Sequence, residues 1–363
     1  MRTVRAYILV LLLVAMSTAA AFEMPVITGE TMPDTQGHHI NAHGGAILAH
    51  DGTYYWYGEH RGTVDKPGQL GVSCYSSTDL HNWENRGIVL SMTDSVGAPL
   101  EKGATIERPK VIYNPRTGKF VMWFHHEMKG RGYGAAFAGV AVADTPTGPF
   151  RHVRSSRVNA GRYPQGMTEE QKKVKYDYSK EWWTPEWREE IKEGSFVLRD
   201  LYGGQMARDM NLYVDDDGTA YHIFSSEDNL TLQIAELDPT FTHHTGKYIR
   251  IAPAGHNEAP AVFKHDGTYW MITSGCTGWA PNEARLMKAP SIMGPWEQLP
   301  NPCRGEKSEI TFGGQSTSVF VNDGKYTFMA DVWNPKNLGD SRHLWLPIQF
   351  GKDGVPFIPW PGK

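Results

Sequence analysis

The pattern of hydrophobic and polar residues repeats a hairpin signal five times along the chain. In each repeat, an Asp-Gly or Thr-Gly pair suited to a tight turn is followed by a run of aromatic and β-branched residues. The five segments are residues 51–56, 117–123, 217–222, 266–271 and 323–328. Repeated hairpins at this wide spacing predict a series of small sheets, as in a β-propeller. Because a propeller gathers one strand of every sheet around a central axis, residues far apart in sequence should meet in one pocket.

A second signal follows three of the hairpins at a similar position. Turn-forming residues lead to one large aromatic in residues 77–83, 144–150 and 289–296. Turns of this kind occur in any all-β protein, but their fixed position relative to the hairpins favours a structural repeat. We expect each turn to close on a buried aromatic at the outer edge of a blade.

Residues 155–205 interrupt the β pattern. Thr168 and Gln171 have the spacing of a capping box, and Pro185 follows Thr184 as it would at the first position of a helix. Three tryptophans accompany these signals: Trp182, Trp183 and Trp187. The segment is expected to be a helical insertion, either packed outside a blade or placed as a lid that adds an aromatic subsite to the pocket.

The amino-terminal residues have the pattern of a secretory signal peptide. Arg2 and Arg5 precede an apolar run over residues 6–16, and small residues occupy 17–21. The apolar run is too short to span a membrane. We therefore expect residues 1–21 to be cleaved, residues 22–363 to form a single propeller domain, and the protein to be exported to the periplasm or the extracellular space.

Charge and composition narrow the class of ligand. The formal net charge is −4 and no block of basic residues occurs, which argues against nucleic-acid binding. The chain has 12 tryptophans; some should lie in the core, and a sugar-binding site would use the rest, because aromatic rings stack on sugars. Of three cysteines, Cys276 and Cys303 are the pair that an exported protein could join, although all three also suit small buried positions.

Polar residues lie just before or between the hairpins, where strands should approach the axis. They are His43, Glu59, Glu107, Asp209, Glu258 and Gln315. Glu258 precedes a strongly apolar strand, and a carboxyl held against apolar surface has a raised pKa and can act as a general acid. A single carboxylate at such a position is often a solvated rim residue, but several at one position of the repeat favour a functional site.

Six segments resemble glycoside hydrolase family 43, and most of all its exo-β-1,3-galactanase-like branch. They are residues 107–114, 208–210, 258–260, 273–282, 315–317 and 340–348, and the resemblance extends from about Ile40 to Phe350. It implies an all-β, five-bladed β-propeller and hydrolysis with inversion of the anomeric centre. The implied fold agrees with the hairpins counted independently.

The resemblance also implies residue roles. Glu258 matches the general acid, Asp209 the aspartate that tunes and orients it, and Gln315 the residue that activates water in this branch. A neutral amide is a very weak base, so we expect Gln315 to position water, with Asp34 as an alternative base. Matches to substrate-binding positions are Glu107, His43, Glu59, Tyr133, Thr277 and Trp279; for His43, a hydrogen-bonded position in the pocket floor is an equal alternative.

We therefore expect an exported, inverting exo-glycosidase that acts on a galactose-containing plant glycan such as β-1,3-galactan. The alternatives are an α-L-arabinofuranosidase or β-D-galactofuranosidase of the same family, and a non-catalytic sugar-binding propeller. The expected partner is an oligo- or polysaccharide, with no organic cofactor and no catalytic metal, and we expect the chain to be a monomer.

Overall fold

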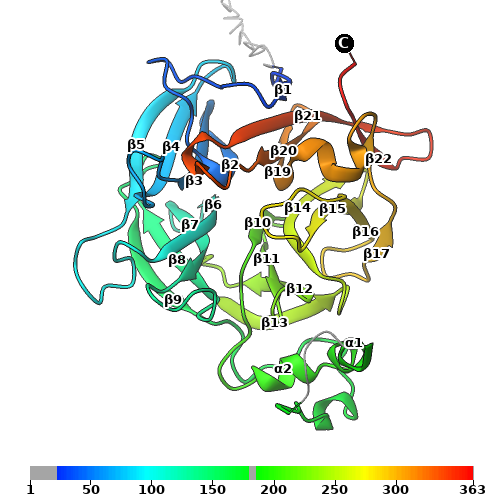
Figure 1. The fold of residues 1–363 in the computed structure, drawn as a ribbon. Coiled ribbons are helices and arrows are strands. Elements are labelled where there is room, and N and C mark those ends of the chain that lie inside the picture. Colours follow the sequence, from blue (N-terminus) through cyan, green and yellow to red (C-terminus); the bar gives the residue numbers. More distant parts are fainter. Residues whose placement is uncertain (1–22, 180–184, 363) are drawn as a thin grey trace, which may run out of the picture.

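Five sheets of mostly antiparallel strands stand around a central axis (Figure 1). The computed structural model describes residues 23–179 and 185–362. The predicted five-bladed β-propeller with a helical insertion is confirmed. The predicted signal peptide, residues 1–21, lies outside the described residues.

The first four blades each contain four strands in sequence order. Blade 1 consists of β2 (His43–His50), β3 (Thr53–His60), β4 (Gly71–Ser77) and β5 (Glu84–Ser91). Blade 2 consists of β6 (Thr105–Asn114), β7 (Lys119–Glu127), β8 (Phe137–Ala143) and β9 (Arg151–Ser156). Blade 3 consists of β10 (Met210–Val214), β11 (Ala220–Ser226), β12 (Thr231–Leu237) and β13 (His244–Ile251). Blade 4 consists of β14 (Asn257–His265), β15 (Thr268–Gly275), β16 (Arg285–Ala289) and β17 (Glu297–Leu299).

Blade 5 joins the two ends of the described chain. It contains β19 (Gln315–Asn322), β20 (Lys325–Val332), β21 (Arg342–Phe350), β22 (Pro356–Pro359) and β18 (Cys303–Arg304). The amino-terminal strand β1 (Ile27–Thr28) pairs with β21. Trp345 of β21 also packs against Trp56 and Trp83 of blade 1, with ring centroids 4.8 Å and 6.0 Å away. Strand pairing and aromatic packing therefore close the ring between blades 5 and 1.

All five predicted hairpins connect the first and second strands of a blade. Asp51 and Gly52, with φ of 47° and 73°, have the left-handed conformation that a two-residue hairpin turn requires. The first strands contact one another around the axis. The hairpins thus mark one face of the ring, and the amino-terminal ends of the first strands open on the opposite face.

The outer turns also lie where the sequence predicts them. Trp83, Phe150 and Trp296 directly precede β5, β9 and β17, the fourth strands of their blades. Trp83 and Phe150 are buried, whereas Trp296 is half-buried against the core that blades 3 and 4 share. The hairpin turns and the outer aromatic residues therefore both recur at matching positions of the blades.

The helical insertion packs on the outside of blade 3 (Figure 1). It contains the 3₁₀-helix η1 (Gln171–Lys173) and the helices α1 (Pro185–Lys192) and α2 (Ser195–Arg199). Thr168 and Gln171 form the predicted reciprocal capping box, with hydrogen bonds of 2.9 Å and 3.2 Å. Trp187 is buried against Phe196 and Leu230, so this tryptophan belongs to a small core of its own. Trp182, Trp183 and Thr184 lie outside the described residues.

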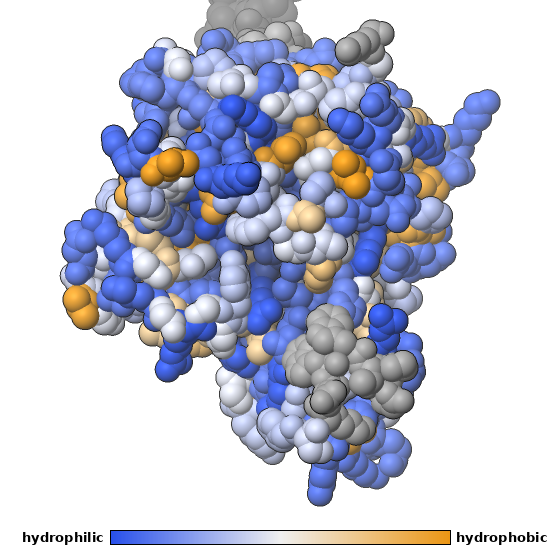
Figure 2. Space-filling view, viewed as in Figure 1, coloured by the Kyte–Doolittle hydropathy of each residue, from blue (hydrophilic) through white to orange (hydrophobic). Residues whose placement is uncertain are grey.

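The surface shown in Figure 2 is mostly hydrophilic, and its hydrophobic residues occur in small separate groups. None of the described helices is long and apolar enough to cross a membrane. Two further 3₁₀-helices, η2 (Ser308–Gly313) and η3 (Leu338–Asp340), flank the inner strands of blade 5.

The proposed cysteine pair is not formed. Cys276 and Cys303 are both free, as is Cys74. Cys276 follows β15 and donates a hydrogen bond to the Asn229 carbonyl oxygen (3.5 Å), whereas Cys303 is buried in β18 beside β22. The pairing was wrong because the two cysteines belong to different parts of the sheet framework; the expectation of small buried residues is right for Cys74 and Cys303.

Candidate active site

A cavity of about 350 Å³ opens at the amino-terminal ends of the first strands. All five blades contribute to its lining, and the volume lies within the range of small-ligand sites. The lining residues are Glu59, Arg61, Glu107, Arg108, His125, Tyr133, Arg208, Asp209, Asn229, Glu258, Gly278, Trp279, Gln315 and Trp333.

A repeated irregularity of the backbone orients the side chains at this end. His43, Glu107 and Glu258 hold equivalent places in blades 1, 2 and 4, and the register with the second strand shifts just after each of them. The next residues have positive φ: Gly44 (60°), Arg108 (53°) and Ala259 (54°). A β-bulge re-aims side chains, and a left-handed non-glycine residue costs roughly 1–3 kcal/mol. The contacts made by the re-aimed side chains must offset that cost.

Glu258 is a protonatable, half-buried group in the lining of the cavity. Burial and, next, the negative charge of Asp209 raise the pKa of the Glu258 carboxyl to about 7, against the lowering effect of Arg108 and Cys276. Asn229 Nδ2 donates a 2.7 Å hydrogen bond to Glu258 Oε1. One carboxyl oxygen is therefore fixed by an amide, and the Cys276 thiol also interacts with the carboxyl group.

Arg108 connects the polar groups on both sides of the cavity. Its guanidinium lies 2.9 Å from Asp209 Oδ2 and donates a 2.5 Å hydrogen bond to Gln315 Oε1. It also donates to the Ser316 carbonyl oxygen (3.0 Å) and lies over the Trp333 ring at 5.7 Å. Asp209 and Gln315 come from blades 3 and 5, so one buried cation sets their relative positions.

The amide of Gln315 has a defined orientation. Its Oε1 accepts hydrogen bonds from Arg108 and from Trp333 Nε1 (2.9 Å), and its Nε2 donates to Ser274 Oγ (3.0 Å). Both partners of Oε1 can only donate, so that oxygen must be the acceptor. Its two lone pairs are used, and one N–H is left for a further partner.

Glu107 is the centre of a charged cluster on another wall. It accepts hydrogen bonds from Arg61 (3.0 Å) and Tyr133 (2.9 Å) and pairs with His125 (3.0 Å). Burial would raise the pKa of Glu107, but the bonds to His125 and Arg61 lower it well below its usual range. His125 also contacts Glu127, and although burial opposes it, these two carboxylates raise the pKa of His125 to about 9. Glu107 is therefore an ionised acceptor beside an imidazolium.

Glu59 lies behind this cluster. It pairs with Arg61 and accepts a 2.8 Å hydrogen bond from the Arg108 backbone N–H. Burial, opposed by Arg61, raises the pKa of Glu59 to about 7, and the negative charge of Glu107 adds to the rise. Glu59 can therefore hold a proton at neutral pH while Glu107 remains charged.

Most of the predicted site residues meet in the cavity. Its lining includes Glu258, Asp209, Gln315, Glu107, Glu59, Tyr133 and Trp279. Trp279 packs edge-on against Trp333, with centroids 5.2 Å apart, and is 41% exposed. Sequence reasoning missed several other lining residues: Arg61, Arg108, His125, Arg208, Asn229 and Trp333. Arg108 stands next to Glu107 in a recognised motif, but Trp333 and Asn229 come from loops without a local pattern.

Three predicted residues lie elsewhere. Asp34 accepts hydrogen bonds from the backbone N–H groups of Gln36 and His38 and lines a different cavity. The prediction that Asp34 could be the alternative base is therefore wrong, because this carboxylate stabilises a loop away from the site. His43 has no exposed surface and does not line the cavity, so the predicted sugar contact is wrong. Its ring nitrogens also have no hydrogen-bond partner among the described residues, so the hydrogen-bonded alternative is wrong too. Thr277 does not line the cavity and bonds within its own loop.

The insertion does not reach the cavity with any described residue of 155–205. It does support one wall indirectly. Arg199 of α2 pairs with Asp228, which also lies 3.5 Å from Arg208 Nη2. Asp228 is adjacent to Asn229, the residue bonded to Glu258. Of the two alternatives, the described residues of the insertion fit the one in which it packs outside a blade. None of these described residues forms a lid over the cavity.

Glu107, His125 and Asp209 bring three potential metal-ligand atoms within 4.8 Å of one another. Glu107 already pairs with Arg61 and Asp209 with Arg108. His125 lies between the carboxylates of Glu107 and Glu127. Two guanidinium groups oppose the entry of a metal cation. The donor set fits an ion-pair network better than a metal centre.

Known proteins with a similar sequence or structure belong to one family of glycoside hydrolases. The Glycosyl hydrolases family 43 profile matches residues 185–356. A solved GH43 β-1,3-galactosidase with galactodeoxynojirimycin is 60% identical, covers 93% of this chain and 99% of that chain, and has a TM-score of 0.91. The exo-β-1,3-galactanase from Clostridium thermocellum is 34% identical, with 92% of this chain and 65% of that chain covered and a TM-score of 0.74.

A curated relative carries a different name. The β-D-galactofuranosidase xynD of Aspergillus niger is 27% identical over 139 residues, which is 38% of this chain and 40% of that protein. The match to this relative is therefore partial in both chains.

Replacing Asp209 by Asn should lower the pKa of Glu258 below about 7. The substitution removes a like charge and leaves the positive charge of Arg108 uncompensated beside the carboxyl. The pKa can be followed by NMR titration of ¹³C-labelled glutamate, with the Glu258 signal assigned from its loss in Glu258→Gln. Asp94→Asn, at an exposed ion pair, is the control. An unchanged or higher pKa in Asp209→Asn would show that Asp209 does not tune Glu258.

Proposed function

Because the chain belongs to glycoside hydrolase family 43, we propose that it is an exo-acting β-1,3-galactosidase that releases terminal galactose with inversion. The observation that carries the proposal is Glu258, a half-buried carboxyl beside Asp209 whose pKa is raised to about 7. The β-1,3-galactosidase that is 60% identical over 93% of the chain supports the choice of substrate.

Glu258 supplies the proton in the proposed mechanism. Asn229 donates to Oε1, so the proton resides on Oε2 and passes to the glycosidic oxygen as the bond to the anomeric carbon breaks. The resulting carboxylate is stabilised by the positive charge of Arg108 and Arg208, both of which favour the ionised form of Glu258. Asp209 keeps the free carboxyl protonated near neutral pH before the reaction.

Gln315 positions the attacking water by donating its remaining Nε2–H. The amide oxygen cannot take this role, because Arg108 and Trp333 already donate to Oε1. Glycosidase transition states resemble an oxocarbenium ion, which attracts even a neutral nucleophile. In this proposal orientation provides the main effect, and the water proton leaves to solvent after the new C–O bond has formed.

The wall around Glu107 holds the terminal sugar. An ionised Glu107 accepts hydrogen bonds from sugar hydroxyls, while Tyr133 and Arg61 hold it in place. Trp279 and Trp333 present indole rings at another side of the cavity, suited to the C–H face of a pyranose. Charged acceptors on one wall and aromatic rings on another fit a single terminal sugar and support exo action.

We also propose that residues 1–21 direct export, because a charged start, a short apolar run and small residues follow one another there. A monomer is the proposed state. A β-D-galactofuranosidase is the second candidate, favoured by the partial match to the Aspergillus niger protein.

The proposal predicts galactose as the first product from debranched β-1,3-galactan, without intermediate oligosaccharides, and in the α configuration by NMR as it forms. Arabinan and an aryl galactofuranoside, tested in parallel, separate the alternatives. Glu258→Gln should release no galactose from the natural glycan while still binding it, because the amide cannot protonate the leaving oxygen. Release of galactofuranose or pentose instead would reject β-1,3-galactan as the substrate, and a β product would reject inversion.

Gln315→Ala should lower kcat by about 100-fold or more, because a misplaced nucleophile costs that much. Ser274→Ala, which removes only the hydrogen bond donated by Gln315 Nε2, should lose less than about 10-fold. Circular dichroism and thermal unfolding report whether both variants remain folded. A folded Gln315→Ala enzyme with nearly full kcat would remove Gln315 from the mechanism.

A further inference from the structure

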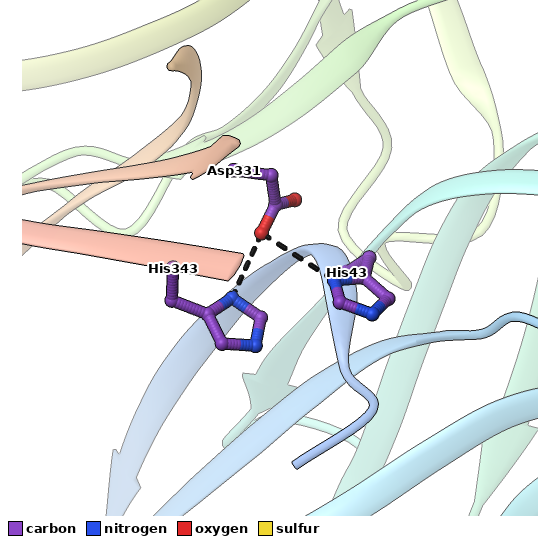
Figure 3. A group of neighbouring side chains, drawn as sticks. All are labelled: His43, Asp331 and His343. Atoms are coloured by element: carbon purple, nitrogen blue, oxygen red, sulfur yellow. Dashed lines mark hydrogen bonds and ion pairs between the residues drawn. The ribbon is translucent and has the colours of Figure 1, made fainter. Parts of the chain in front are cut away.

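Three buried side chains converge where blades 5 and 1 meet (Figure 3). They are His43 at the start of β2, Asp331 in β20 and His343 in β21, and each is at most 2% exposed. Asp331 pairs in register with Gln315, one of the cavity residues. None of the three has a role in the proposed reaction.

His43 has unused ligand capacity in this group. Neither ring nitrogen has a hydrogen-bond partner among the described residues, although the side chain is completely buried. Its Nδ1 lies 3.7 Å from Asp331 Oδ1, beyond hydrogen-bond distance, and points toward it (Figure 3). With no partner on either ring nitrogen, a neutral imidazole here carries a free lone pair and can serve as a ligand. An unpaired polar group at such a site is costly unless a ligand satisfies it.

The other two side chains are oriented by outer contacts. Asp331 Oδ2 accepts a 2.5 Å hydrogen bond from the Gly44 backbone N–H, which leaves Oδ1 directed into the group. His343 Nε2 lies 3.2 Å from the Ile40 carbonyl oxygen, while its Nδ1 lies 2.8 Å from Asp331 Oδ1. Both nitrogens of His343 thus face oxygen acceptors. Two oxygen acceptors can both be satisfied if each ring nitrogen carries a proton. Alternatively, Nδ1 carries no proton and directs its lone pair at a cation that Asp331 also binds.

The spacing of the ligand atoms suits one small ion. One atom from each residue lies within 4.8 Å of the others, and the two measured separations are 2.8 Å and 3.7 Å. A tetrahedral ion with bonds of about 2.0 Å places its ligands about 3.3 Å apart, between these values. Contacts such as those from Ile40 and Gly44 are typical of metal ligands, whose second polar atom is usually held by a neighbouring group.

We propose that His43, Asp331 and His343 bind one zinc-class divalent transition-metal ion. Two imidazoles and one carboxylate match Zn²⁺ and its neighbours, whereas Ca²⁺ and Mg²⁺ require mostly oxygen ligands. The ion links β2 of blade 1 to β20 and β21 of blade 5, where the ring closes. It therefore strengthens closure and takes no part in bond cleavage. Because the ligands are buried, the ion enters during folding.

The test is the metal content of protein refolded from guanidinium with Zn²⁺, with Co²⁺ or with EDTA, followed by desalting. We expect about one equivalent of zinc by mass spectrometry, visible ligand-field bands from Co²⁺, and a lower Tm after refolding with EDTA. His43→Asn and His343→Asn should lose the metal. His126→Asn should retain it, since His126 is equally buried with unpartnered ring nitrogens but lies outside the group.

Wild-type protein needs no substitution to decide the question. A chain that refolds with Zn²⁺, retains less than about a tenth of an equivalent and has the same Tm as the EDTA sample would overturn the proposal, as would full zinc retention by folded His43→Asn. The first result would assign the unpartnered nitrogens to buried water. Metal content and Tm do not depend on the substrate, so this outcome is separate from that of the proposed activity.

Discussion

The arrangement of the site depends on one buried cation, the guanidinium of Arg108. It holds Asp209 through an ion pair and Gln315 through a hydrogen bond, and these two residues come from different blades. The planar guanidinium reaches these acceptors and the Ser316 carbonyl oxygen with donors on separate nitrogens in a fixed geometry, whereas the three donors of a lysine ammonium all lie on one nitrogen. Leaving such a buried charge without its partner costs about 3–5 kcal/mol. The same contact therefore fixes the geometry and ties it to the stability of the ring.

The β-bulge next to Arg108 shows how one repeated backbone feature can place side chains with different chemical roles. The bulge and left-handed residue recur in blades 1, 2 and 4, and the residue before the left-handed position differs in each. In blade 4 this residue is Glu258, whose pKa is raised by burial and by Asp209. In blade 2 it is Glu107, which its cationic neighbours keep ionised. In blade 1 it is His43, which is completely buried. Neighbours from adjacent blades, and not the strand itself, decide the charge state of each group.

The sequence predicts what is local and repeated. Hairpin turns, outer aromatics and the capping box depend on residues close together in the chain, and each is found where expected. The grouping of Glu258, Asp209, Gln315 and Glu107 follows from the repeat together with the family resemblance. What could not be predicted are contacts between blades. The occupied oxygen of Gln315, the loop role of Asp34 and the free Cys276 each depend on a neighbour far away in sequence.

The most direct test of this account is the activity of Arg108→Lys on β-1,3-galactan. Lysine keeps the charge but loses the fixed geometry that holds Asp209 and Gln315, so kcat/KM should fall by about 100-fold while the protein still unfolds cooperatively. Arg86→Lys, at a half-exposed pair with Glu84, should have no effect. A folded Arg108→Lys enzyme within about threefold of the wild type would contradict the central role of the guanidinium.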